Sequence, residues 1–133
     1  MLQNLHVKNI ALIDETEVDF GQGLNILTGE TGAGKSILLG SVGLALGGKY
    51  SSDLLRNGAE NGLVELTFSV DDGQIRQKLE EMDIIPDDGM VTLTRKFTGS
   101  RSISRINGET VNTGKLKAVS YTHLRAHETL MNL

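Results

Sequence analysis

The feature that most limits how this chain can fold is a glycine-rich stretch, Gly29–Ser36, with the spacing G-x-x-x-x-G-K-S. The pattern requires a buried strand before it and a helix after it, because its phosphate-binding N–H groups come from a strand-to-helix turn. Both flanks fit. Leu24–Thr28 is a compact apolar run typical of a buried parallel strand, and apolar residues cover most of a helical circumference from Lys35 to Leu46. Gly47 and Gly48 then end the predicted helix. The sequence therefore predicts an α/β fold built around a phosphate-binding loop.

Each residue type in the stretch has a separate task. Its glycines allow the backbone to approach phosphate oxygens without an intervening Cβ, and these are Gly29, Gly32 and Gly34. Lys35 can reach the β- and γ-phosphates, and the Ser36 hydroxyl is placed to ligate a bridging Mg²⁺. The remaining positions contribute only backbone donors, and these are Glu30, Thr31 and Ala33. We expect this loop to bind ATP with Mg²⁺.

The rest of the chain has the alternating pattern of antiparallel strands, interrupted by one short helix. The alternation predicts two short strands before Gly21 and a helix at Gln74–Met82. Further strands are predicted at Leu63–Val70, Met90–Phe97 and Arg101–Ile106. Asn107–Gly108 favours a tight type I′ turn into Glu109–Val111. We expect these elements to form an antiparallel subdomain beside the phosphate-loop sheet.

Composition narrows the class of protein. A chain of 133 residues with 38% hydrophobic residues is suited to one domain with a real core. The absence of cysteine excludes disulfides, thiolate zinc sites and cysteine nucleophiles. No apolar run approaches the roughly 20 residues that span a bilayer, and the N-terminus lacks the layout of a secretion signal. We therefore expect a cytoplasmic protein without membrane contact.

Charge is distributed unevenly along the chain. Residues 1–90 hold 15 acidic and six basic side chains, whereas residues 91–133 hold two acidic and seven basic ones. Such a local excess can attract phosphate although the whole chain has a net charge of −4. The candidates for contact with a nucleic-acid backbone are Arg95, Lys96, Arg101 and Arg105. The alternative is a solvated strand face whose charges keep an exposed edge from pairing with neighbours.

Two further patterns are weaker. Ile10–Glu15 looks like the apolar strand ending in acidic residues that holds Mg²⁺ in ATPases, but it precedes the phosphate loop and lies in an antiparallel setting, so we expect a solvated turn. Nothing after Ser36 replaces it, because Val91–Thr94 is followed by Arg95 rather than a carboxylate. Near the end of the sequence, a histidine pair and a glutamate lack the spacing of a zinc site, and these are His123, His127 and Glu128. We expect no catalytic base.

The segment Phe20–Ser36 resembles the start of the RecN family of bacterial DNA-repair proteins, in the SMC-like branch of ABC-type ATPases. Most relatives in that branch have asparagine where this loop has Thr31, so the pair Glu30–Thr31 favours the RecN family. Further similar segments are Leu44–Gly48, Ser51–Gly58 and Arg101–Gly108. The resemblance covers the chain from Met1 to about Val119, and residues 120–133 resemble translated adaptor sequence.

The resemblance implies an N-terminal lobe of an SMC-like ATPase head at residues 1–119, followed by a non-family, artefactual or disordered tail at residues 120–133. Its implied partners are ATP, DNA, the C-terminal lobe of the same head and a second head in a homodimer. It also implies association with the bacterial nucleoid. Because the Walker B and signature motifs of such heads are missing here, we expect ATP binding without efficient hydrolysis. Alternatives are a small P-loop kinase and a nucleic-acid-binding module without catalysis.

Overall fold

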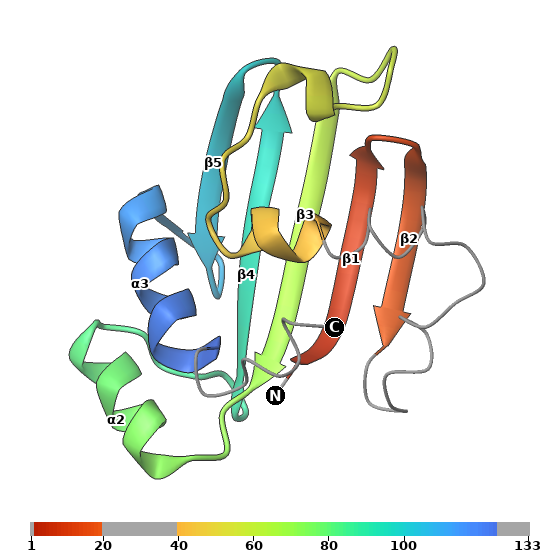
Figure 1. Ribbon diagram of the computed structural model, residues 1–133. Helices are drawn as coiled ribbons and strands as arrows, with labels where there is room; N and C mark the ends of the chain where they lie inside the picture. Colours follow the sequence, from red (N-terminus) through yellow and green to blue (C-terminus); the bar gives the residue numbers. More distant parts are fainter. Residues whose placement is uncertain (1, 20–39, 125–133) are drawn as a thin grey trace.

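The structure, a computed structural model, describes residues 2–19 and 40–124, without the side chains of residues 122–124. Its centre is a six-stranded antiparallel sheet with the strand order β2-β1-β3-β4-β5-β6 (Figure 1). The strands are β1 (Leu2–Ile10), β2 (Ile13–Asp19), β3 (Asn61–Ser69), β4 (Met90–Thr98), β5 (Arg101–Ile106) and β6 (Glu109–Val111). The helices are η3 (Ser52–Leu54), α2 (Gly73–Glu81) and α3 (Thr113–Leu124), and residues 40–45 are also helical.

Alternation along the strands separates an inner face from an outer face of the sheet. The register aligns Val18, Leu5, Leu66, Leu93 and Ile106 in one row across β2, β1, β3, β4 and β5, and all five side chains are buried. The helical segment 40–45 and α3 lie over this inner face (Figure 1). The outer face carries mostly polar and charged residues, as expected for an antiparallel sheet with one face toward solvent.

The helical segment 40–45 ends in the geometry predicted from its glycine pair. Gly47 has φ of 100°, a left-handed conformation that favours glycine. The Gly48 N–H donates to the Gly43 carbonyl at 2.9 Å and the Gly47 N–H to the Leu44 carbonyl at 3.1 Å. This pair of bonds is a Schellman motif, which satisfies carbonyls at a helix end.

Most of the predicted antiparallel elements are confirmed within a residue or two of their expected bounds. The tight turn after β5 has φ of 50° at Asn107 and 87° at Gly108, as a type I′ turn requires. Asp72 begins α2 by accepting a hydrogen bond from the Gln74 N–H at 2.8 Å. The predicted parallel strand at Leu24–Thr28 and the loop at Gly29–Ser36 lie outside the described residues.

The residue pattern alone did not predict α3. Asn112 precedes the helix and accepts a hydrogen bond from the Lys115 N–H at 2.7 Å, which is helix-capping geometry. Leu116 and Val119 are completely buried against the rest of the protein. The helix continues to Leu124, past the boundary predicted at residue 119, and that domain boundary stays a prediction. Among the residues in view, no helix has the length and apolar character needed to cross a membrane.

Candidate functional site

Segment 40–48 contains the described residues that are nearest in the sequence to the predicted phosphate loop. The loop itself and the predicted Mg²⁺ ligand Ser36 lie outside the described residues, so their assignment stays a prediction. Beside the segment is an apolar hollow of about 450 Å³, which Ile10, Ser41, Leu44 and Leu54 help to line. The C-terminal end of the segment is held by a buried arginine.

Arg95 lies on the inner face of β4 and is only 3% exposed. Its Nη1 donates to the Leu44 carbonyl at 2.9 Å and to the Gly48 carbonyl at 2.6 Å. Its Nη2 donates to the Ser102 hydroxyl at 3.1 Å, and the guanidinium carbon lies 5.2 Å from the centre of the Phe97 ring. Burial lowers the pKa of the guanidinium, which nevertheless stays protonated as arginines in proteins do.

This geometry corrects the assignment of Arg95 to an exposed basic cluster. Its side chain is under the helical segment, where a nucleic-acid phosphate has no access to it in this structure. The strand pattern contains the signal that was missed. Val91, Leu93, Arg95 and Phe97 occupy every second position of β4, so the alternation places Arg95 with the apolar residues.

The other three predicted basic residues share the outer face of β4 and β5. Lys96 and Arg101 are exposed, and Arg105 is half-buried. The register pairs Lys96 with Ile103, which lies midway between Arg101 and Arg105 on β5, so the three charges are neighbours. At about 3.3 Å per residue, Arg101 and Arg105 are about 13 Å apart along the strand. The structure therefore brings three of the four predicted residues together.

A hollow of about 410 Å³ lies beside this group on the outer face. Basic, hydroxyl and acidic side chains line it, among them Lys96, Arg105, Thr92, Thr94, Glu65 and Asp87. The Thr94 hydroxyl donates to the Glu65 carboxylate at 2.9 Å, so one of the two acidic groups is already hydrogen-bonded. The Arg105 Nε is buried and has no hydrogen-bond acceptor among the described residues.

The acidic pair that resembled an ATPase Mg²⁺ strand lies in β2, at the edge of the sheet, rather than in a turn. Asp14 and Glu15 are exposed, and Glu15 pairs with Lys8 of β1 in antiparallel register. The Glu15 carboxylate is 2.7 Å from His6 Nε2, and this hydrogen bond holds the pKa of Glu15 below its usual value. No group of three metal-binding side chains occurs among the residues that the structure describes. The His123 side chain and residues 127 and 128 are outside them.

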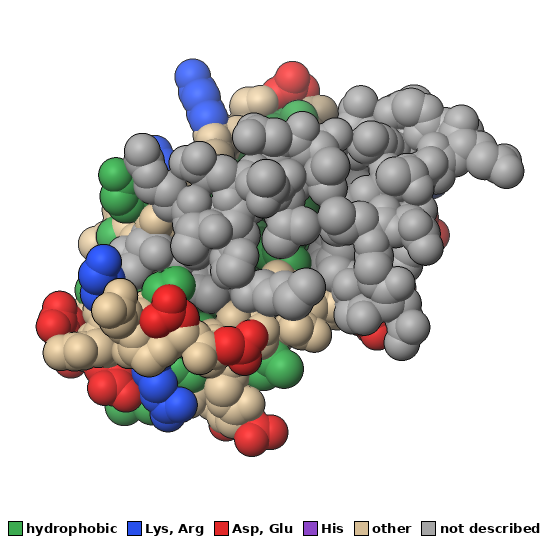
Figure 2. All heavy atoms as spheres, turned by 60° about the horizontal axis from the view of Figure 1, so that its bottom comes forward, with side chains coloured by type: hydrophobic (Ala, Val, Ile, Leu, Met, Phe, Trp, Pro, Cys, Tyr) green, Lys and Arg blue, Asp and Glu red, His purple; other side chains and the backbone are tan. Residues whose placement is uncertain are grey.

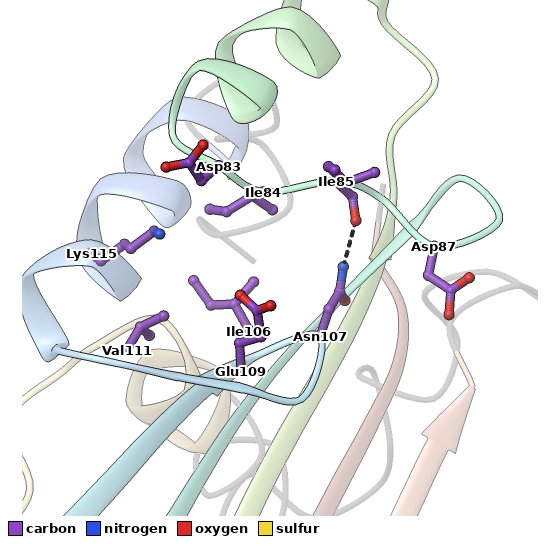
Figure 3. Close-up of a pocket in the computed structure, with 9 residues that line it drawn as sticks. All are labelled: Asp83, Ile84, Ile85, Asp87, Ile106, Asn107, Glu109, Val111 and Lys115. Atoms are coloured by element: carbon purple, nitrogen blue, oxygen red, sulfur yellow. Dashed lines mark hydrogen bonds between the residues drawn. The ribbon is translucent and has the colours of Figure 1, made fainter.

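A third hollow, of about 270 Å³, lies between the turn after α2, the β5–β6 hairpin and α3 (Figure 3). Its apolar part includes Ile84 and Ile106, and the Lys115 side chain extends from α3 toward the side of the hollow where Asp83 lies. Asn107 closes one edge by donating to the Ile85 carbonyl at 3.0 Å (Figure 3). Around α2, at the end of the molecule turned forward in Figure 2, acidic and basic side chains are interspersed. Both regions hold more acidic than basic side chains, unlike the basic group on β4 and β5.

Comparisons with known proteins agree with this architecture. The model of the family described as "AAA domain" matches residues 4–129. DNA repair protein RecN of Synechocystis sp. is 47% identical over 120 residues, which cover 84% of this chain and 20% of that protein. RecN of Halalkalibacterium halodurans is 40% identical over 129 residues, 96% of this chain and 23% of that protein. The chain thus spans about a fifth of the length of these relatives.

Solved structures show the same fold at lower identity. A structure from work on the ATP-driven dimerisation and DNA-stimulated activation of SMC ATPases has a TM-score of 0.70 and 19% identity, covering 91% of this chain and 78% of that one. The Smc head domain from Pyrococcus yayanosii has a TM-score of 0.67 and 19% identity, covering 91% of this chain and 25% of that one. The predicted fold class, the N-terminal lobe of an SMC-like P-loop head with an antiparallel subdomain, is confirmed. With the matched family and the RecN likeness, it follows that this chain belongs to the AAA domain family and is a RecN-like member of it.

Proposed function

We propose that the chain is the ATP-binding N-terminal lobe of a RecN-like DNA-repair ATPase. The observation that carries the proposal is the motif Gly29–Ser36 within a sequence that matches the AAA domain family from residue 4 to residue 129. In this proposal the loop's backbone N–H groups and Lys35 bind the phosphates, and Ser36 ligates Mg²⁺. In the same proposal Glu30, Thr31 and Ala33 contribute backbone donors.

The lobe binds ATP but does not turn it over efficiently by itself. The carboxylates resembling a Mg²⁺ strand, Asp14 and Glu15, belong to an exposed edge strand, and the chain spans about a fifth of the RecN proteins it matches. The remaining catalytic groups would come from a C-terminal lobe and from a second head in a homodimer. In the bacterial cell the whole protein would act at the nucleoid in the cytoplasm, as the RecN likeness suggests.

Titration with a fluorescent ATP analogue and Mg²⁺ tests the phosphate role. Wild type should bind, and Lys35→Ala should lose most of its affinity, because the loop loses its full positive charge. The matched control is Lys78→Ala on α2, an exposed lysine far along the chain from the loop, which should bind like wild type. Equal affinity of Lys35→Ala and wild type would contradict the proposal.

A second function, contact with DNA, is favoured by the grouping on the outer face. Lys96, Arg101 and Arg105 are neighbours on β4 and β5, on a face over which no other described element packs. We propose that these three side chains contact backbone phosphates in the whole protein, a sequence-independent interaction that falls with salt.

A further inference from the structure

Arg95 has a role beyond packing. We propose that Arg95 is a positioning residue for the nucleotide site: its guanidinium fixes the end of segment 40–48 on the sheet, and this sets the affinity of the loop at residues 29–36 for ATP. The inference rests on the proposed nucleotide-binding function. From the sequence alone, Arg95 was expected to contact nucleic-acid phosphates instead.

The contacts of Arg95 are those that a helix end needs. The last carbonyls of a helix have no partner within the helix, and the helix dipole places partial negative charge there. Leu44 already accepts a hydrogen bond from the Gly47 N–H, and the Arg95 Nη1 donates to the same carbonyl and to that of Gly48. One cationic group thus binds two carbonyls of the segment, while Ser102 and Phe97 hold its other side. Both bonds to the segment come from the one nitrogen Nη1, which leaves Nη2 to donate to the Ser102 hydroxyl.

Stability alone does not account for an arginine at this position. The neighbouring inner-face positions of β4 are apolar, and a buried cation loses its hydration. The Arg95 Nε is buried without an acceptor among the described residues, so the group is not fully compensated. A side chain such as methionine would fill similar space without that desolvation cost. What methionine lacks are the two hydrogen bonds to the Leu44 and Gly48 carbonyls, which tie the segment to β4.

The same end of the segment is also tied to α3. The Ser120 hydroxyl donates to the Leu46 carbonyl at 3.1 Å, and Lys117 packs so closely on Gly47 that an added Cβ would lie 2.6 Å from its Cγ. The segment is thus held by β4 and by α3. Residue 40 is only four positions after Ser36, and four residues span at most about 14 Å. Where segment 40–48 lies therefore limits where Lys35 and Ser36 can lie.

The test compares Arg95→Met with wild type in the 133-residue chain. The measurements are affinity for a fluorescent ATP analogue with Mg²⁺ and amide hydrogen exchange of residues 40–48. We expect faster exchange in the segment and about tenfold weaker binding, because apparent affinity falls with the fraction of molecules that hold the competent arrangement. The control is Val91→Ala, a buried change on the same strand that lowers stability and leaves in place the Arg95 groups that bond to the segment. Its affinity should match that of wild type at temperatures where both are folded.

The outcomes separate this inference from the function on which it rests. If wild type does not bind the analogue, the proposed function fails and the inference falls with it. If wild type binds, Lys35→Ala does not, and Arg95→Met binds like wild type, only the inference is overturned. Equal losses in Arg95→Met and Val91→Ala would also overturn it, since general destabilisation would then explain both. Should Arg95→Met not fold, Arg95→Gln carries the same test: its uncharged amide ends closer to the backbone than the guanidinium does, and unchanged affinity refutes positioning.

Discussion

The outer face of β4 and β5 makes a quantitative prediction about DNA binding. Each phosphate that a basic side chain neutralises in duplex DNA contributes about −0.9 to the slope of log affinity against log salt. The structure leaves three of the predicted residues on this face, since Arg95 is buried on the other one. The expected slope is therefore about −2.7. With all four residues in contact it would be about −3.6.

Lys96→Ala is the decisive variant, because Lys96 is exposed and lies between Arg101 and Arg105. Its slope should be about −1.8, so that affinity falls about 12-fold between about 50 mM and about 200 mM salt, against about 40-fold for wild type. Fluorescence anisotropy with labelled duplex DNA across that salt range measures both. Lys78→Ala, on α2, should keep the wild-type slope. A Lys96→Ala slope equal to that of wild type would refute the assignment of this face.

Three further predictions concern local structure. Gly47→Ala should lower the free energy of unfolding by about 1–3 kcal/mol, because φ is 100° and the new Cβ would lie 2.6 Å from Lys117 Cγ; an unchanged urea midpoint would contradict this. Asp72→Ala removes the cap of α2 and should cost about 1 kcal/mol in the same assay, with no loss if the cap is not formed in solution. Glu15→Gln should lower the melting temperature at neutral pH, because the lowered pKa of Glu15 means that its bond to His6 stabilises the folded state while the carboxylate is ionised. The difference from wild type should vanish as pH falls below the ordinary value of 4.5, and a difference that grows there would reverse the sign of the argument.

Local patterns were sufficient for most of the antiparallel sheet. The type I′ turn at Asn107–Gly108 and the helix end at Gly47 depend on φ values that few residues other than glycine and asparagine adopt. The residue types at these positions therefore identify both features. α3 was missed because its capping residue, Asn112, directly follows a strand and its two buried residues, Leu116 and Val119, make a short apolar pattern. Its stability comes from packing, which a short segment does not show by itself.

Arg95 and Lys96, which are adjacent in β4, show what the sequence determines and what only the tertiary structure decides. Sequence alone determined the motif Gly29–Ser36, the strand-rich pattern around it and the excess of basic residues after position 90, because these depend on residue type and spacing along the chain. Only the tertiary structure decided that Arg95 lies under the helical segment while Lys96 faces outward. Neighbouring residues of a strand point to opposite faces, and which face is covered depends on where segment 40–48 and α3 pack. Two positive charges side by side in the sequence thus acquire different tasks through long-range contacts.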